Sequence, residues 1–507
     1  MSSAKKVAVN TFAMYTQLIV NVLIGLISVR IILNALGASD YGIYNLIAGI
    51  ITMLGFIKNS LSQTSIRFIS VSLGENDKRK INKAFSSCFY LHAIIAISLA
   101  IIMEIVGLFL FDGFLNIPED RIHAAKVIYH CMTFSLFINV FGTPFRALLV
   151  AHEKFVYISF VGIFDAILKL LIALVIVRVQ SDKLQVYGFL MAIITVINIF
   201  CYYIVCQIKY RNDMSFVRCN KKDLGQVSGF AGWTLMDVAG SVATRQGYAI
   251  LLNIYFGTIV NAVFALARQL EGHIYQISSS VIDSMKPQIM KSKGAGDDER
   301  MLRLSLTAGK FGLMLMSLIA IPLMVNMDYV LKLWLKEVPE GTAIFSIFLI
   351  LACMAEQLTK GLVFANQAIG NIKWFSISVS SMRFIALPIS WLLFSLGAPA
   401  IAAIITFTIC ESLGSLSRVF ILSRLSDFQT KTFFRSLFTQ ILPPALIATL
   451  CCMGFSRLVN GIWGLLLSLI ITDCLYLLVM YLFGLSLDEK KSIKSIIGTF
   501  TKKKKNI

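Results

Sequence analysis

Two stripes of polar and charged side chains lie on residues 232–287, a stretch that is otherwise apolar. Within each stripe the polar residues recur every three or four positions, which places them on one face of an α-helix. The first stripe consists of Asp237, Ser241, Thr244, Arg245 and Tyr248, and the second of Arg268, Glu271, Tyr275, Ser278 and Ser279. The stretch predicts two hydrophobic helices joined by a tight turn at Gly257.

The charges on these stripes restrict what the helices can face. An ionised side chain at the centre of a bilayer costs roughly 2.5–3.5 kcal/mol on insertion scales. The stripes should therefore face each other, other helices or a water-filled cavity. We expect them to line a passage for something polar and anionic.

The composition is that of a membrane protein. The chain has 507 residues, of which 57% are hydrophobic and 14% charged, and its mean hydropathy is +0.79. Apolar runs of about twenty residues recur along the whole length, which predicts an all-α polytopic membrane protein. Its net charge of +19 lies mostly in alternate loops. Membrane topology accounts for that pattern better than nucleic-acid binding does.

Motifs for metal, nucleotide or disulfide chemistry do not occur in the sequence. The ten cysteines fall mainly inside apolar runs without C-x-x-C spacing, and the five histidines form no H-E-x-x-H. There is no phosphate-binding G-x-x-x-x-G-K-[ST] loop. We therefore expect no cofactor, no metal and no enzymatic activity, and we expect an ion gradient, the membrane potential or the substrate's own gradient to drive the protein.

Loop charges predict the topology. About fourteen spans can be counted, and Lys and Arg are concentrated in alternate loops, notably 78–83, 209–222, 291–303 and 424–435. The opposite loops carry mainly acidic residues. This asymmetry predicts that both termini are cytoplasmic. All loops are too short to hold a soluble catalytic domain.

The sequence repeats itself at an offset of about 220 residues. Residues 37–83 line up with 257–303 without a gap, so that Gly74 meets Gly294 and Asp77 meets Asp297. Each repeat holds six spans, which predicts two parallel six-helix halves. The predicted parts are an N-terminal half at 1–222, a C-terminal half at 223–430, two additional helices at 431–484 and a basic amphipathic tail at 485–507.

The first repeat carries polar stripes on the helices that match the opening pair. The stripe residues include Gln17 and Asn21 on the first span, and Lys58, Gln63 and Arg67 on the second. The simplest arrangement places all four helices around one central cavity between the halves.

Other ionisable residues also lie within spans. Asp165 with Lys169, and Glu356 with Lys360, are spaced i, i+4, and each pair has both a structural and a functional interpretation. Arginines near span ends can instead snorkel to the interface. The arginines to which this interpretation applies are Arg30, Arg146 and Arg383. Glu104 and Asp473 are isolated acids within spans.

The start of the chain carries a motif with a family resemblance. Arg30, Leu33, Gly37 and Asp40-Tyr-Gly, followed by Arg67 and Gly74, resemble the opening of polysaccharide-unit (O-antigen, Wzx-type) flippases. These belong to the multidrug/oligosaccharidyl-lipid/polysaccharide (MOP) exporter superfamily. The resemblance in architecture extends over the whole chain.

The resemblance implies a bacterial inner-membrane protein that moves an undecaprenyl-pyrophosphate-linked oligosaccharide outward by alternating access. Its partners would be the lipid-linked substrate, membrane lipid and polysaccharide polymerases. The phosphates would bind Arg245, Arg268, Lys58 and Arg67, whose donors suit phosphate oxygens. The side chains expected to contact the sugars are Tyr275, Gln17, Asn21 and Gln63.

Alternatives remain open at this level. A multidrug/cation antiporter of the same superfamily would use an acid such as Asp237 or Glu271 for ion coupling, and Glu356 and Lys360 are further coupling or pairing candidates. Arg268 and Glu271, spaced i, i+3, could also form a structural pair, as could Arg245 and Asp237. A lipid II flippase is a closer alternative, and a membrane-embedded glycan polymerase or ligase is a more distant one.

Overall fold

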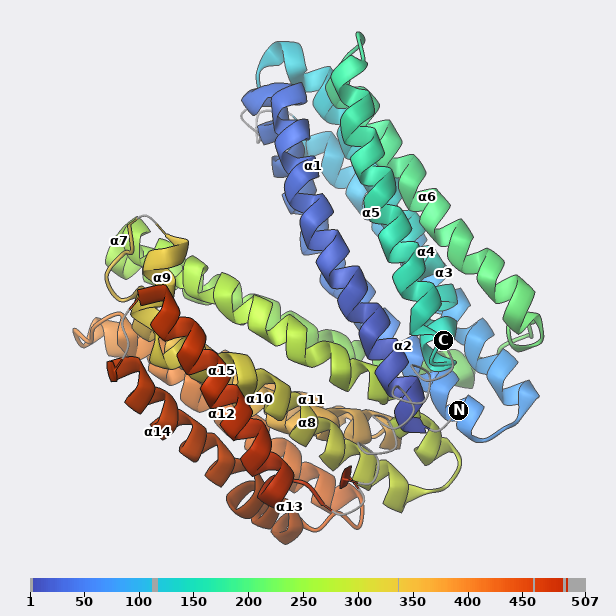
Figure 1. The fold of residues 1–507 in the computed structure, drawn as a ribbon. Helices are drawn as coiled ribbons and strands as arrows, with labels where there is room; N and C mark the ends of the chain where they lie inside the picture. Colours follow the sequence, from blue (N-terminus) through green and yellow to red (C-terminus); the bar gives the residue numbers. More distant parts are fainter. Residues whose placement is uncertain (1–2, 112–116, 336, 459–460, 487–488, 491–507) are drawn as a thin grey trace, which may run out of the picture. The chain divides into compact units, whose positions relative to one another are not determined.

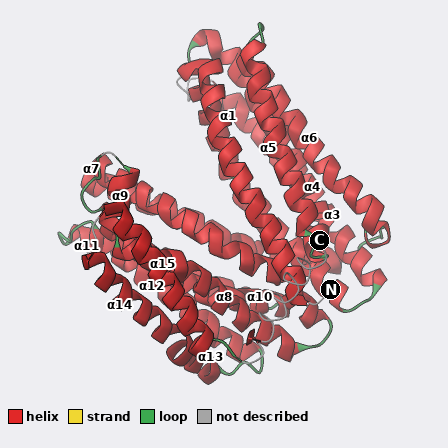
Figure 2. Cartoon of the chain, in the orientation of Figure 1, coloured by secondary structure: helices red, strands yellow, loops and turns green. Residues whose placement is uncertain are grey.

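The computed structural model describes residues 3–111, 117–335, 337–458, 461–486 and 489–490 (Figure 1). Across these ranges the chain is helical and contains no strand (Figure 2). The long helices are α1 (Ser3–Met53), α2 (Gly55–Gly74), α3 (Lys78–Phe109), α4 (Ile122–Ala151), α5 (Phe155–Arg178), α6 (Lys183–Tyr210), α7 (Lys221–Gly294), α8 (Asp298–Val325), α10 (Thr342–Ile369), α11 (Lys373–Ser395), α12 (Ile401–Leu425), α14 (Leu442–Leu458) and α15 (Gly461–Val479). Two shorter helices are α9 (Met327–Trp334) and α13 (Thr430–Ser436).

The helices are long and apolar enough to form a multi-pass membrane protein. Twelve helices among the described residues could cross a bilayer, or thirteen if the bent pair Ser39–Ile51 and Gly55–Gly74 counts as one more span. Helix α7 is counted once there, although its 74 residues bend at Gly257 into two arms that are each long enough to span. Counting the second arm of α7 and the bent pair in addition to the twelve gives the fourteen predicted spans.

The predicted repeat is visible in the backbone. Gly37 in α1 and Gly257 in α7, about 220 positions apart, both leave the helical conformation, with φ near +80° and ψ near ±170°. A side chain is disfavoured at positive φ, so glycine permits both kinks. The equivalent residues Asp77 and Asp297 both cap the next helix, accepting hydrogen bonds from the backbone N–H groups of Arg79 and Arg300.

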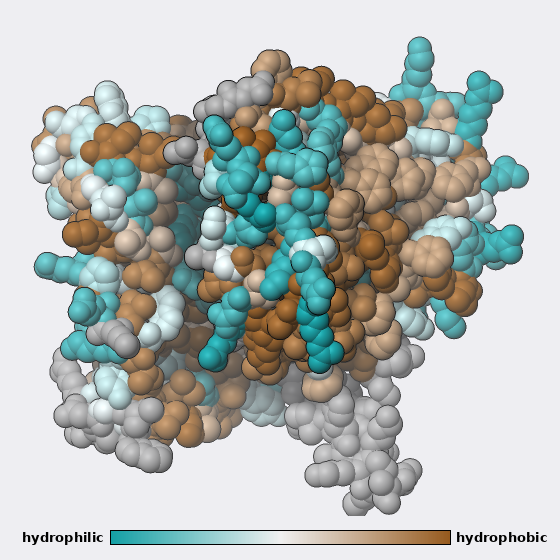
Figure 3. Space-filling model, turned by 90° about the horizontal axis from the view of Figure 1, so that it is seen from above, coloured by the Kyte–Doolittle hydropathy of each residue, from teal (hydrophilic) through white to brown (hydrophobic). Residues whose placement is uncertain are grey.

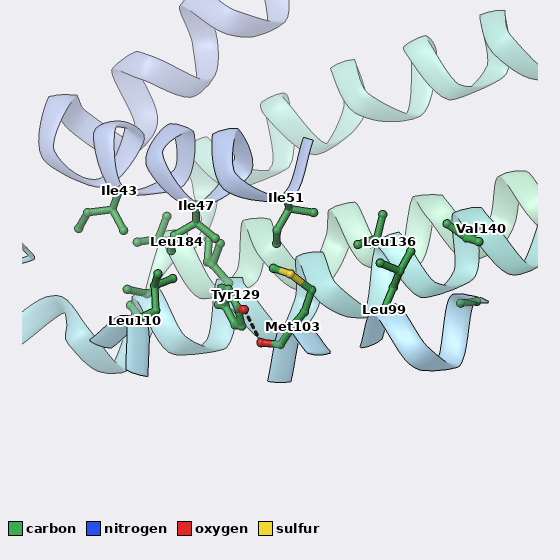
Figure 4. Packing of buried hydrophobic residues seen from close by; sticks show 14 of the residues in the cluster. Ile43, Ile47, Ile51, Leu99, Met103, Leu110, Tyr129, Leu136, Val140 and Leu184 are labelled. Atoms are coloured by element: carbon green, nitrogen blue, oxygen red, sulfur yellow. Dashed lines mark hydrogen bonds between the residues drawn. The ribbon is translucent and has the colours of Figure 1, made fainter. Parts of the chain in front are cut away.

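One compact unit, called the N-terminal unit here, comprises Val9–Val238 and Met290–Gly296. In its core the second arm of α1 packs on α3, α4 and α6 through residues such as Ile47, Leu99 and Leu184 (Figure 4). The buried Tyr129 hydroxyl donates to the backbone oxygen of Met103. This core fixes the helices that carry the polar residues of the first repeat.

The two repeat-equivalent glycines touch within this unit. A Cβ added at Gly74 would lie 2.1 Å from the carbonyl oxygen of Lys291, and one added at Gly294 would lie 2.0 Å from that of Val71. Only glycine allows the ends of α2 and α7 to approach so closely. The nearby Lys291 ammonium lies 2.7 Å from the Glu153 carboxylate.

A charged cluster holds another end of the N-terminal unit. Arg121 donates to Asp40 of α1 and, at 2.8 Å, to Asp182, which also caps the start of α6. Partial burial raises the pKa of Asp182, but the hydrogen bonds from Arg121 outweigh it and hold that pKa below its ordinary value. The cluster therefore joins three helices through one guanidinium.

The other compact unit, the C-terminal unit, comprises Met1–Ala8, Ala239–Ile289 and Asp297–Ile507. Its core joins α7, α10, α11 and α12 around residues such as Tyr248, Leu349 and Phe407. The additional helices α14 and α15 pack on α8 through Ile321, Ala448 and Tyr476. The predicted boundaries near residues 222 and 430 stay predictions, and most of the predicted tail, 491–507, lies outside the described residues.

The surfaces of the helices match a lipid environment. Large apolar side chains such as Phe12, Ile254 and Ile259 are exposed, and hydrophobic residues cover broad areas in Figure 3. In water such an area would favour aggregation, whereas a bilayer solvates it. The structure is therefore that of a multi-pass membrane protein, and its buried charges must be explained by contacts in the interior.

Candidate functional site

A polar pocket lies inside the C-terminal unit, among α7, α10, α11 and α12. Its volume is about 30 Å³, enough for about two water molecules. Both arms of α7 contribute to it, because the kink at Gly257 returns the helix alongside itself. The lining residues are Ser241, Thr244, Arg245, Arg268, Glu271, Leu349, Ala352, Cys353, Glu356, Arg383, Phe407 and Glu411.

Arg268 lines this pocket from the second arm of α7. Its Nη1 lies 3.5 Å from the Glu271 carboxylate, which makes the predicted i, i+3 pair a long one. The guanidinium lies over the ring of Phe407, 4.4 Å from its centroid. Its Nε and Nη2 atoms are buried and have no hydrogen-bond partner among the described residues. These N–H groups can therefore bind an acceptor that enters the pocket.

Arg245 lines the same pocket on the other arm of α7 and is exposed. Within the described ranges no carboxylate forms an ion pair with it, so the alternative pairing with Asp237 is not found. Asp237 lies on the part of α7 that belongs to the N-terminal unit and does not line the pocket. Arg245 consequently adds to the pocket a positive charge that is not held in an ion pair among the described residues.

A buried cluster of two arginines and one glutamate forms the far wall. Arg383 donates from Nε and Nη2 to the two carboxylate oxygens of Glu411, at 3.0 and 2.9 Å. Arg418 lies behind them, 3.7 Å from the same carboxylate, and donates to Thr359. The interpretation of Arg383 as a snorkelling residue is wrong, because its side chain is only 10% exposed and its Nε and Nη2 both donate to Glu411.

Glu411 is a site residue that was not predicted from the sequence. A signal was present, since Glu411 and Arg418 are spaced i, i+7 on one face of an apolar helix. A charged pair at that spacing inside a span is unusual enough to mark an internal face. Its partner on α11 cannot be read from spacing.

The expected pair between Glu356 and Lys360 does not form in the part of the chain that the structure describes. Lys360 donates instead to the Tyr275 hydroxyl at 2.8 Å and lies 3.7 Å from Asp283. Glu356 lines the pocket and forms no ion pair with any residue in the described ranges. Tyr275, predicted to contact sugars, therefore has Lys360 as its polar partner.

The predicted residues of the first repeat lie apart from this pocket, in the N-terminal unit. Lys58 donates to the Asn139 side chain at 3.0 Å. Arg67, nine residues along α2 and thus about 13 Å away, lies over the rings of Phe68 and Phe230. Lys58 and Arg67 therefore do not form one site.

The uncharged candidates are dispersed in the same unit. The Gln17 amide lies against Gly162 of α5, where an added Cβ would be 2.0 Å from Nε2. Asn21 is exposed on α1, and Gln63 is half-buried on α2. Their proposed contacts with sugars stay predictions.

Comparison with known proteins places this fold. Residues 13–175, about a third of the chain, match the MatE family model. A MATE protein crystallised in complex with MaD3S superposes with a TM-score of 0.68 at 12% identity, covering 83% of this chain and 97% of that chain. No curated relative matches the sequence closely enough to add a further comparison.

Two further structures have the same fold. The Vibrio cholerae MATE transporter VcmN in its bent form gives a TM-score of 0.63 at 16% identity, covering 85% of this chain and 97% of that one. A MOP-superfamily transporter from Pyrococcus furiosus, described as having a binding pocket of reverse polarity, gives 0.64 at 12% identity, with coverages of 83% and 96%.

The chain thus has the fold of the MATE transporters. The matched family consists of transporters, not enzymes, and the multi-pass architecture agrees with that class. Identities of this size establish the fold alone, so the substrate must be argued from the residues in the pocket.

Proposed function

We propose that this transporter moves an undecaprenyl-pyrophosphate-linked oligosaccharide from the cytoplasmic to the periplasmic leaflet of a bacterial inner membrane by alternating access. The observation that carries the proposal is Arg268, whose Nε and Nη2 are buried at a pocket without an acceptor. Leaving such donors unpaired costs about 1–3 kcal/mol or more for a charged group. A phosphate oxygen would satisfy them.

The rest of the pocket supports an anionic ligand. Arg245 lines it and forms no ion pair among the described residues, and with Arg418 behind the wall four arginines face the three glutamates Glu271, Glu356 and Glu411. The pocket has room for about two water molecules, which is the scale of one anionic group. The sugar chain would therefore lie beyond this pocket, and the phosphate would be the part that the arginines hold.

The membrane potential would favour this direction of movement. Carrying two negative charges outward across an inside-negative membrane is favourable by about 4–5 kcal/mol per 100 mV if they cross the whole field. The transporter would then need little further ion coupling. Glycan polymerases that act on the periplasmic product would be its partners in the pathway.

A multidrug/cation antiporter is the second candidate function. The comparisons favour it, since the similar structures include MATE multidrug transporters. Glu356 also favours it, because an unpaired carboxylate at a pocket can bind a proton or a metal cation. Under this reading Glu271 and Glu356 would exchange ions for a cationic substrate.

Substitution of Arg268 separates a substrate role from a structural one. Arg268→Ala removes charge and fork, whereas Arg268→Lys keeps the charge alone. We expect Arg268→Ala to abolish surface-polysaccharide export while the protein accumulates normally in the membrane, and Arg268→Lys to retain part of the activity. Glu340→Gln, at an exposed loop position, serves as the control.

The structural explanation makes the opposite prediction. If Arg268 only neutralises Glu271, the alanine variant should accumulate poorly because a buried carboxylate is left unpaired. The Arg268→Ala, Glu271→Ala double variant should then recover both protein level and export. Recovery of export in that double variant would contradict the proposed phosphate contact.

A further inference from the structure

A second charged cluster lies inside the N-terminal unit, on α2, α4 and α5. Lys58 donates to Asn139, and both Arg146 and Lys169 act electrostatically on its ammonium. The single acid of the cluster is Asp165, whose carboxylate accepts a hydrogen bond from Lys169 at 2.7 Å. The cluster thus holds three cations and one carboxylate, which leaves an excess of two positive charges.

Uncharged polar groups complete this cluster. Asn198 of α6 donates to the second oxygen of Asp165 at 2.6 Å. Tyr202, one turn further along α6, interacts with Arg146. Gln17 of α1 packs on Gly162, one turn before Asp165 on α5. The cluster therefore draws on α1, α2, α4, α5 and α6, and its charges are held at fixed positions by side-chain contacts.

The charge excess needs an explanation. Arg146 is exposed, whereas its neighbours Phe145 and Ala147 are buried. Arg146 shares one face of α4 with Asn139, which accepts from Lys58. An arginine on a lipid-facing surface within a span would cost several kcal/mol, so we expect this polar face to contact water or a polar ligand. An unneutralised excess of two charges at such a face attracts a dianion.

We infer that this cluster is a second anion site, which binds a phosphate-type dianion through Lys58, Arg146 and Lys169. The site is separate from the pocket at Arg268 and belongs to the other unit. The inference rests on the proposed function only for the origin of the anion, which is either the diphosphate of a lipid carrier or a free phosphate compound.

Asp165 has a defined part in this site. Its two carboxylate oxygens accept hydrogen bonds from Lys169 and Asn198, at the distances given above. An entering phosphate competes with it for Lys169, because both groups accept from the same ammonium. Asp165 is therefore a built-in competitor, and its charge weakens anion binding that the three cations would otherwise strengthen.

If Asp165 only held the site together, its loss should weaken anion binding. As a competitor of the anion, its loss should instead strengthen binding. Asp165→Asn keeps the size of the side chain, releases Lys169 and raises the excess to three charges, so pyrophosphate should bind about tenfold more tightly. Lys58→Gln lowers the excess and should weaken pyrophosphate binding about tenfold. Lys126→Gln removes the same charge at an exposed position and should leave binding unchanged.

The test is calorimetric titration of the purified full-length protein in detergent with inorganic pyrophosphate at constant ionic strength. Each variant is measured alone and with Arg268→Ala, so that the pocket of the C-terminal unit makes no contribution. The inference is supported if Asp165→Asn tightens binding and Lys58→Gln weakens it in both backgrounds. Thermal unfolding of each variant confirms that the protein titrated is folded.

Three results would overturn the inference. They are weaker binding in a folded Asp165→Asn variant, unchanged binding in Lys58→Gln, and loss of all pyrophosphate binding on Arg268→Ala alone. If farnesyl diphosphate competes with pyrophosphate, the ligand is a lipid diphosphate. If it does not compete, the ligand is a free phosphate compound. Both outcomes agree with an anion site at this cluster. Because the titration measures no transport, a failed flipping assay would not contradict this anion site. A failed titration would likewise not contradict the proposed transport function.

Discussion

Glu411 should be the residue whose loss destabilises the C-terminal unit most. Its side chain is 6% exposed and accepts two hydrogen bonds from Arg383, at 3.0 and 2.9 Å. Charge-assisted hydrogen bonds contribute roughly 1.5–3 kcal/mol each, which gives about 3–6 kcal/mol for the pair. Breaking a buried ion pair from one side costs about 3–5 kcal/mol. Glu411→Gln should therefore lower the free energy of unfolding by about 3–5 kcal/mol.

This loss comes from the arginines that Glu411 neutralises. Glu411→Gln removes this carboxylate from Arg383 and Arg418, although Arg418 keeps its bond to Thr359. Adding Arg383→Gln removes one of these two positive charges, so the double variant should recover about half of the lost free energy. Glu340→Gln, at an exposed position, should change it by about 0.5 kcal/mol at most.

The assay is reversible unfolding in mixed lipid–detergent micelles, followed by helical circular dichroism over a range of denaturing detergent. A double-mutant cycle gives the coupling between Arg383 and Glu411. A loss under about 1 kcal/mol for Glu411→Gln, or a double variant no more stable than the single one, would refute the argument that the pair is a buried structural unit.

Three other predictions concern the N-terminal unit and the topology. Gly74→Ala places a Cβ 2.1 Å from a carbonyl oxygen and should destabilise by about 1–3 kcal/mol, whereas Gly25→Ala meets open space and should be neutral or stabilising, as unfolding of both variants would show. The lowered pKa of Asp182 stabilises the folded protein at any pH above about 3.9, the pKa of this group in the unfolded chain. Stability should therefore fall as the pH drops through the folded-state pKa, and Asp182→Asn should reduce this dependence on pH. A reporter active only outside the membrane should give signal when fused at Glu337 and none at Asn220, and the reverse would contradict the charge-based orientation.

The features that sequence predicted well depend on local pattern. Gly257 was predicted as a turn because two apolar, 3.6-periodic runs meet there, and the backbone changes direction at that residue. The i, i+4 spacing of Asp165 and Lys169 left a structural and a functional interpretation open, and in the structure Lys169 Nζ lies 2.7 Å from Asp165 Oδ2. Such interactions are set by helix geometry, which spacing determines.

The features that sequence missed depend on contacts between helices. Glu411 and Arg383 are 28 positions apart on two different helices, and nothing in their spacing brings them together. The sequence offers Glu356 as a local partner for Lys360, four residues away. In the structure Lys360 lies instead near Asp283, which belongs to another helix. The choice between a local and a distant partner is made by packing, as is the close approach of Gly74 to the end of α7.

Outward movement of a diphosphate-linked oligosaccharide in proteoliposomes tests the central claim most directly. We expect purified wild-type protein to move a fluorescent undecaprenyl-diphosphate-linked glycan in response to an imposed membrane potential. The Arg245→Ala, Arg268→Ala double variant, reconstituted to the same density, should not move it. Normal flipping by that variant, or a wild-type protein that ignores the glycan and exchanges a cationic dye for protons or sodium ions, would contradict the proposed function.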